Sequence, residues 1–174
     1  MTSLRMSRPE PNEHAEYYIR YISLVPDGDI VKTLASQLND TLTLLRGVTE
    51  NVGNTRHAPY TWSVKEVVGH LADAERVFGY RALRFARNDI TPLPGFEEND
   101  YVRNANFDAC TLKGLVDEFE FVRRSSLAFF GNLSEEAWGR SGSANNSPVR
   151  VRAIAFIMAG HELHHTAILR KRLG

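Results

Sequence analysis

The chain has 174 residues, of which 43% are hydrophobic and 24% charged, which is the composition of an ordinary globular domain and excludes global disorder. It carries 21 basic and 21 acidic residues, so no net charge attracts it to nucleic acid or to an anionic membrane, and we expect neither as a partner. No apolar run reaches the roughly 20 residues of a membrane span. The N-terminus lacks the apolar core of a signal peptide, and the single cysteine, Cys110, excludes an internal disulfide. We therefore expect a soluble cytoplasmic protein.

Hydrophobic residues recur with a helical period in four long segments, and no segment alternates convincingly as a strand. The first helix is expected to follow the sequence PDGD, with Asp27 or Asp29 as its N-cap, and to end near Val52 and Gly53. Ahead of it, residues 13–24 (EHAEYYIRYISL) are expected to form a short aromatic helix across the bundle.

The second helix has the strongest start signal, in the sequence TWSVKEVVGHL. Ser63 and Glu66 have the spacing of a capping box, and Trp62 and Val67 have the spacing of a hydrophobic staple. The second helix is therefore expected to begin directly after Ser63, and its apolar stripe continues to Phe85.

The third helix is expected to begin after Thr111 and to end at a C-cap formed by Gly131 and Asn132. A short turn, SEEAW, and a polar loop, GRSGSANNSP, separate it from the fourth helix. The fourth helix is expected to begin between Ser147 and Arg150, with Ser147 and the following proline supplying its cap.

Four long amphipathic helices predict an all-α fold, a four-helix bundle. We expect residues 27–174 to form the bundle and residues 1–26 to be an N-terminal extension that packs on it. The connection between the second and third helices, residues 88–110, is too long to be only a link, and loops of this size are usually functional or mobile. Because Pro92 and Pro94 give it shape, we expect it to form a lid or a wall of a site.

The fourth helix carries three histidines in the sequence MAGHELHHTAIL. His161 and His165 are four residues apart, so their rings lie on one helix face, and two neutral imidazoles at this spacing can chelate Zn²⁺, Ni²⁺ or Fe²⁺. His161 and His164 could also form a pair. We prefer His165 because it continues the apolar stripe of the helix, whereas His164 falls beside the stripe.

His70, on the second helix, strengthens this interpretation. It follows Val67 by three residues and therefore faces or edges the apolar stripe. Helix bundles build metal sites from inward side chains on facing helices, and burying an unpaired imidazole costs about 1–3 kcal/mol for each hydrogen bond that is not made. Two arrangements stay open: one metal site formed by His70, His161 and His165, or separate surface or hydrogen-bonded positions for the three rings.

The order of His161, Glu162 and His165 literally matches the zinc-protease pattern H-E-x-x-H. However, Glu162 directly follows His161, so we expect its side chain to point away from the ligand face. A zinc protease would also need a third ligand downstream and an edge strand that binds the peptide. We predict neither feature and therefore do not expect a protease.

The motif W-S-x-K-E-V-x-x-H-L, the following PLPGFEENDYV and the terminal G-H-E-x-x-H form a specific combination. Together they resemble the DinB-like superfamily of bacterial four-helix-bundle metalloenzymes, and the resemblance extends from about Tyr17 to the end of the chain. It implies three histidine ligands to one divalent metal, which fall on His70, His161 and His165, an open coordination position and a homodimer. Some relatives are similar to thiol S-transferases that act on a low-molecular-weight thiol, and others are described as metal-dependent hydrolases. Arg150 departs from the family pattern, which often has a helix-capping serine there.

Three neutral imidazoles leave a cation its full charge and a vacant position, as at catalytic rather than structural zinc sites. We expect zinc or nickel, with iron or manganese as alternatives, to activate a bound thiol or water. The expected activity is thiol transfer involving a small-molecule substrate, or alternatively hydrolysis. A non-catalytic bundle that binds metal or only dimerises is a third interpretation.

Asp73 lies three residues after His70 and therefore near the same helix face. It could orient a ligand, act as a catalytic base or bind the metal itself. A surface ion pair with Arg76 or Arg81 is the structural alternative.

The substrate pocket is expected to be formed by Trp62, Tyr101 and the 88–110 connection. Arg81 and Arg84 could bind the carboxylate of a thiol substrate. Surface ion pairs are the simpler role for both arginines.

Overall fold

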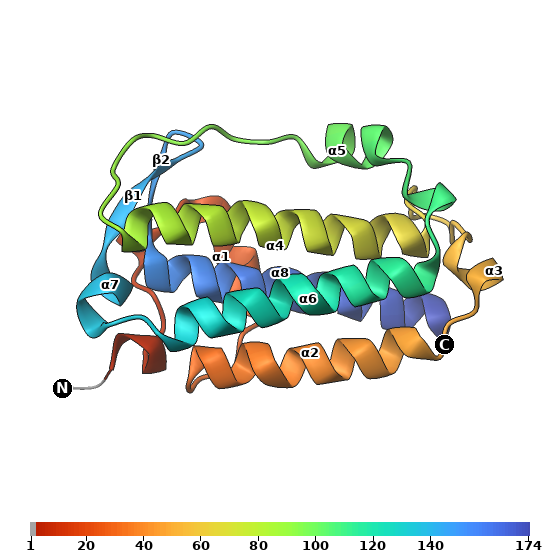
Figure 1. Cartoon of the computed structure of the whole chain (residues 1–174), viewed down its shortest axis with the longest axis horizontal. Helices are drawn as coiled ribbons and strands as arrows, with labels where there is room; N and C mark the ends of the chain where they lie inside the picture. The colour runs from red at the N-terminus through yellow and green to blue at the C-terminus, as the bar shows by residue number, and fades with distance from the viewer. Residues whose placement is uncertain (1–2) are drawn as a thin grey trace.

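The computed structural model describes residues 3–174, and four long helices form its frame (Figure 1). These helices are α2 (Ile30–Arg46), α4 (Val64–Ala86), α6 (Leu112–Gly131) and α8 (Val151–Leu173). Helix α4 packs against α6 and α8, and α2 packs against the same two helices, so α2 and α4 are diagonal to each other. The predicted four-helix bundle is confirmed.

The long helices run in two directions: α2 and α8 run one way, and α4 and α6 run the other (Figure 1). Because the neighbours α4 and α6 are parallel, the chain returns along the whole bundle between them, a distance of about 34 Å for the 23 residues of α4. This connection contains α5 (Glu98–Ala105) and the 3₁₀ turn η4 (Phe107–Ala109). It is therefore a structured segment alongside α4. No helix within residues 3–174 is long and apolar enough to cross a membrane.

Capping side chains set the starts of the first two long helices. The Asp29 carboxylate accepts hydrogen bonds from the backbone N–H groups of Val31 and Lys32 at the start of α2. Ser63 and Glu66 form the predicted capping box at the start of α4. Both predicted helix starts are confirmed.

The first long helix is shorter than predicted. It ends at Arg46 instead of near Val52, because Gly47 follows it and Thr49 caps a separate short helix, α3 (Glu50–Gly53). A capping residue inside an apolar periodic segment thus ends one helix and starts another.

The prediction that the chain has no strand is wrong. β1 (Ser141–Ala144) and β2 (Ser147–Arg150) form an antiparallel hairpin that follows the short helix α7 (Glu135–Gly139). Asn145 and Asn146 connect the strands with φ angles of 52° and 59°, the left-handed conformation that two-residue hairpin turns require and asparagine tolerates. Each strand has only four residues, and glycine, proline and serine make up most of them, so the alternation that marks most strands is missing.

The hairpin also changes the expected start of the fourth helix. Ser147 lies in β2 and does not cap α8, which begins directly after Arg150 without a capping side chain. The N–H of Leu93, in the long connection, donates to the Ser143 carbonyl (2.9 Å), and the Leu93 carbonyl accepts from the N–H of Asn145 (3.0 Å). The hairpin therefore holds the first part of the connection in place.

The N-terminal segment consists of four short helical turns that lie along the bundle (Figure 1). They are η1 (Leu4–Met6), η2 (Pro11–Glu13), η3 (Glu16–Tyr18) and α1 (Ile19–Ile22). Helix α1 packs on α8, and Gly160 allows this close approach, because a Cβ atom there would lie 2.1 Å from the carbonyl oxygen of Tyr21. Glu13 is buried and accepts a hydrogen bond from Arg152 (2.6 Å), which ties the segment to the start of α8.

The buried hydrophobic residues form two separate clusters. On α4 the change from one cluster to the other falls between Ala72 and Ala74. On α8 the first cluster ends at Ala159 and the second begins at Leu169. Polar side chains are buried at the level between the two clusters.

Arg123 of α6 lies at this level and is only 1% exposed. It donates to both carboxylate oxygens of Glu75 on α4 (2.7 and 2.8 Å) and to the carboxylate of Glu162 on α8 (2.6 Å). It also donates to the carbonyl oxygen of Leu34 on α2 (3.3 Å). One guanidinium group therefore joins all four long helices.

Replacing Arg123 with methionine should lower the free energy of unfolding by about 3–5 kcal/mol, because two buried carboxylates lose their cation. Chemical denaturation measures this change. The matched control is Arg124→Met, which removes only an exposed pair with Glu120 and should change stability by less than about 1 kcal/mol. Equal effects of the two substitutions would contradict the role given to Arg123.

Candidate metal centre

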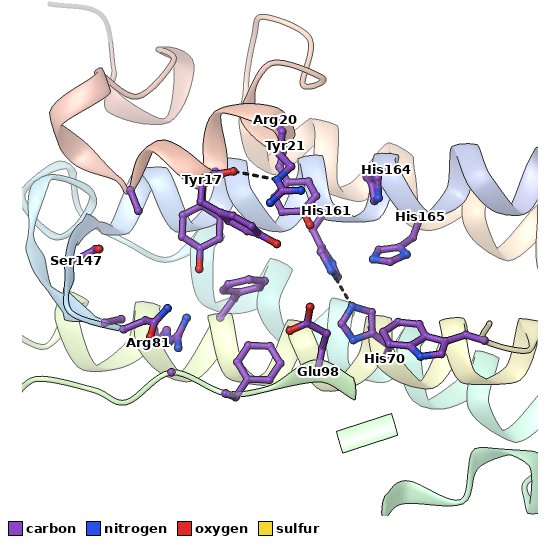
Figure 2. A pocket seen from close by; sticks show the side chains of 18 residues that line it. Tyr17, Arg20, Tyr21, His70, Arg81, Glu98, Ser147, His161, His164 and His165 are labelled. Carbon is purple, nitrogen blue, oxygen red and sulfur yellow. Dashed lines mark hydrogen bonds between the residues drawn. The ribbon is translucent and has the colours of Figure 1, made fainter. Parts of the chain in front are cut away.

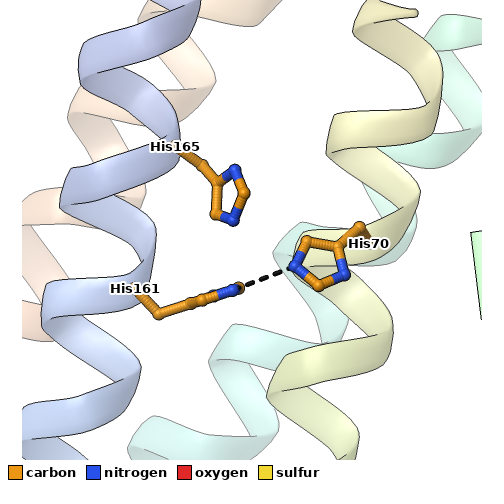
Figure 3. Close-up of side chains that lie close together, drawn as sticks. All are labelled: His70, His161 and His165. Atoms are coloured by element: carbon orange, nitrogen blue, oxygen red, sulfur yellow. Dashed lines mark hydrogen bonds between the residues drawn. The ribbon is translucent and has the colours of Figure 1, made fainter. Parts of the chain in front are cut away.

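Three histidines meet between α4 and α8 (Figure 3). His70 comes from α4, His161 and His165 come from α8, and one ring nitrogen of each lies within 4.8 Å of the others. The Nε2 atoms of His70 and His161 are 3.0 Å apart. Of the two arrangements that the sequence left open, the structure has the one in which the three rings converge.

His164 does not join this group. Its ring packs edge-on against the ring of Tyr21, with the centroids 5.5 Å apart. The helix period therefore separates His164 from His165, as expected from the position of each residue relative to the apolar stripe.

Burial keeps the three imidazoles neutral. It lowers the pKa of His70 to about 4. Burial and the neighbouring imidazoles of His70 and His164 together lower the pKa of His165 to about 3. The pKa of His161 lies well below its ordinary value for the same two reasons. Neutral imidazoles have the free lone pairs that a divalent transition metal requires.

A cavity of about 400 Å³ lies beside the histidines (Figure 2). Its walls are mainly aromatic and come from the N-terminal segment, from α4 and the residue before its cap, and from the long connection: Tyr17, Tyr18, Tyr21, Trp62, Phe78 and Phe96. Arg81, Glu98 and Ser147 add polar groups. Apolar walls with a few polar groups are typical of a small-molecule site.

The two residues predicted to form the substrate pocket have different positions. Trp62 lines the cavity, with its ring 4.9 Å from that of His70 and stacked on that of His165 at 6.5 Å. Tyr101 is 45% exposed and does not line the cavity. It packs against Phe96, whose ring is 5.2 Å away and does line the cavity, so Tyr101 supports the wall from outside.

Asp73 does not line the cavity either. Its carboxylate lies 3.6 Å from the guanidinium of Arg76, and burial raises the pKa of Asp73. Glu162 also points away from the histidines, since its carboxylate accepts hydrogen bonds from Arg123 and from Thr41 (2.6 Å). The glutamate of the H-E-x-x-H pattern is therefore occupied in the buried charged layer.

Tyr21 and Glu98, which were not named individually as site residues from the sequence, also line the cavity; Glu98 belongs to the 88–110 connection that was expected to form the pocket. Burial, above all, raises the pKa of the Tyr21 phenol, and neighbouring Tyr17 raises it further. The Tyr21 ring lies 5.5 Å from that of His161. Gly160 beside His161 was the one local sign that another segment approaches α8 here.

The metal-free protein should lose stability as the pH falls from about 6.5 to about 4. The folded-state pKa values of His70 and His165 lie below the ordinary value of 6.5, so in this window the unfolded chain binds protons that the folded chain does not. Each such proton lowers the free energy of unfolding by about 1.4 kcal/mol per pH unit. Urea unfolding in the presence of a chelator measures the slope, and the double variant His70→Gln, His165→Gln should show a shallower one. Parallel curves for the two proteins would contradict the expected neutral state.

The chain is similar in sequence to a curated protein and in structure to several solved proteins. A protein of Geobacillus kaustophilus named "Putative metal-dependent hydrolase GK0616" is 28% identical over 145 residues, which cover 78% of this chain and 79% of that protein. YfiT from Bacillus subtilis, described as "a probable metal-dependent hydrolase with an unusual four-helix bundle topology", has a TM-score of 0.73 at 14% identity, over 97% of this chain and 95% of YfiT. A mycothiol-dependent maleylpyruvate isomerase has a TM-score of 0.67 at 12% identity, over 79% of this chain and 58% of its own.

The two structural likenesses, at these low identities, show a shared fold. The family model of the DinB superfamily matches residues 33–169. This match covers most of the chain and includes His70, His161 and His165. The chain therefore belongs to the DinB superfamily.

Proposed function

We propose that this protein is a metal-dependent hydrolase of small molecules and that His70, His161 and His165 hold its divalent cation. The observation that carries the proposal is the convergence of three neutral imidazoles beside an aromatic cavity. The name of the Geobacillus relative supports the same class of activity.

The residues fit a transition metal. Imidazole ligands suit zinc, nickel and iron, and three protein ligands are the number found at catalytic zinc sites. Within residues 3–174, no cysteine or carboxylate joins the three rings in this group. We propose zinc or nickel, with iron or manganese as alternatives.

A cation held by these rings supplies a Lewis acid, which lowers the pKa of a water molecule or a thiol. Trp62 and the other aromatic walls exclude bulk water from the substrate. Tyr21 keeps its proton because burial raises its pKa, so its hydroxyl can donate a hydrogen bond to negative charge that develops on a substrate oxygen. Glu98, whose carboxylate lines the same cavity, accepts the proton of the attacking water as a general base.

Thiol transfer is the second candidate activity, and it would use the same three histidines. A low-molecular-weight thiol would then take the place of water, and Glu98 would accept the thiol proton. The mycothiol-dependent isomerase shares the fold, which makes this chemistry worth testing in parallel. The homodimer that the resemblance implies and the cytoplasmic location that the sequence led us to expect stay predictions.

Elemental analysis of tag-free protein should find about one equivalent of divalent metal in the wild type. His70→Ala and His161→Ala should each lose it, because two remaining imidazoles bind the ion much more weakly. His164→Ala is the matched control and should keep its metal, since His164 lies on the same helix outside the group. If the wild-type protein stays metal-free after incubation with zinc, nickel or manganese, the proposal is wrong and the interpretation as a non-catalytic helical bundle is favoured.

The metal-loaded protein should hydrolyse p-nitrophenyl esters, and Glu98→Gln should lower kcat by about 10²- to 10⁴-fold without changing the metal content. Glu97→Gln is the control, because Glu97 caps α5 and does not line the cavity. A parallel assay with cysteine and 1-chloro-2,4-dinitrobenzene measures thiol transfer. Thiol conjugation without ester hydrolysis would replace the hydrolase proposal with the transferase, and a fully active Glu98→Gln would remove the general base.

A further inference from the structure

We propose that the cavity takes an elongated molecule with a carboxylate at one end, and that Arg81 holds this carboxylate at the end of the cavity away from the histidines. This substrate class deepens the proposed function and rests on it only for the reaction at the histidine end. The carboxylate site itself depends on the residues around Arg81 and can be tested without metal.

The guanidinium of Arg81 is buried without a counter-ion. The residue is 5% exposed and lines the cavity. Its one hydrogen bond within residues 3–174 runs from Nη2 to the carbonyl oxygen of Pro94 (2.9 Å). The ring centroids of Phe78 and Phe96 each lie 5.9 Å from the guanidinium carbon. Most of the N–H groups of a buried cation are thus left for a ligand, and an unpaired buried charge is costly.

The other buried arginines within the described residues have their partners in the protein. Arg123 pairs with two carboxylates, and Arg152 pairs with Glu13. Arg172 donates to two backbone carbonyls and to a ring nitrogen of His57. Arg84, three residues after Arg81 on α4, pairs with Asp89 and Tyr80. Arg81 therefore differs from these arginines, because its guanidinium faces the cavity and theirs face partners within the protein.

The hairpin and the long connection build a wall around this end of the cavity. Asn145 and Ser147 line the cavity from the hairpin, and both carry groups that can hydrogen-bond a carboxylate. Gly95 lets the connection approach the turn, because a Cβ atom there would lie 2.4 Å from Oδ1 of Asn145. The paired backbone of Leu93 fixes the same contact. The hairpin and the long connection thus form a polar subsite at the Arg81 end of the cavity.

Helix geometry fixes how far this subsite lies from the histidines. His70 and Arg81 are eleven residues apart on α4, which is just over three full turns, so both lie on the same face with a rise of about 16 Å between them. In Figure 2 the two side chains lie toward opposite ends of the cavity, and Glu98 lies between them. A ligand that reaches both ends must therefore be elongated.

The charges of the cavity favour a monoanion in one orientation. Arg81 offers a single planar guanidinium, which matches one carboxylate in geometry and in charge. Its aromatic neighbours suit an apolar body behind the carboxylate. Arg20 also lines the cavity, but it is exposed and donates to the carbonyl oxygen of Tyr17 (3.2 Å), so the described residues around the cavity offer no second buried cation for a dianionic phosphate. In the metal-free protein, Glu98, which lies nearer the histidines, repels the anionic end and so directs it toward Arg81.

The test is isothermal titration calorimetry of the metal-free protein with 4-phenylbutyrate and with its uncharged isostere, 4-phenylbutanamide. The carboxylate should bind at least ten-fold more tightly than the amide, and Arg81→Gln should remove this difference. Arg81→Lys, which keeps the charge but loses the planar fork, should retain part of it and guards against an effect of misfolding. Arg84→Gln is the matched control and should leave both affinities unchanged.

Equal binding of acid and amide, or a preference that survives Arg81→Gln, would overturn the proposal. Tighter Arg81-dependent binding of phenylphosphonate than of 4-phenylbutyrate would overturn the choice of a carboxylate. The experiments distinguish a failure of this proposal from a failure of the proposed hydrolase function. Metal-dependent hydrolysis of neutral esters with no carboxylate preference would sink the Arg81 site alone, whereas Arg81-dependent binding in a protein that takes up no metal would sink the hydrolase alone.

Discussion

The position of the candidate metal centre depends on one buried guanidinium group. Arg123 lies on α6 and contacts α2, α4 and α8. The free-energy cost of removing its charge from water is offset only if all these partners are in place together. Glu162 directly follows His161, and Glu75 lies five residues after His70. The contacts that hold the four helices in register therefore also hold both helices that carry the histidines. Between the two apolar clusters lie the charged groups of Arg123, Glu75 and Glu162, and the three imidazoles lie at about the same level on the side of the cavity.

Those parts of the fold that local chemistry determines could be predicted from the sequence. The cap at Asp29 and the box formed by Ser63 and Glu66 act within one helical turn, so their meaning does not depend on distant residues. The hairpin could not be predicted in the same way. Its strands have only four residues each and contain glycine, proline and serine, and β1 pairs further with Leu93, some fifty residues earlier in the chain. The two asparagines at its turn were the signal that could have revealed it.

The same distinction applies to the site. The helical period was enough to predict that His70, His161 and His165 converge once two facing helices were expected. Each of these residues lies on or at the edge of an apolar stripe. Tyr21 and Glu98 come from short or irregular segments whose contacts with the bundle are set by tertiary packing. Sequence periodicity carries no information about such contacts. The prediction for Asp73 rests only on its nearness in sequence to His70. In the folded chain, Asp73 faces Arg76 instead.

The cavity combines a fixed frame with walls of a different origin. The histidines and Arg81 stand on long helices, whereas the aromatic and polar walls come largely from the N-terminal segment, the long connection and the hairpin. Segments of this kind can change in sequence without moving the helices beneath them. The distance from His70 to Arg81 cannot change in this way, because it is a rise of about 16 Å along one helix. If both ends bind one ligand, α4 selects that ligand by length and the surrounding segments select it by shape. A substitution in the walls should then alter which carboxylate is accepted while the separation of its two ends stays the same.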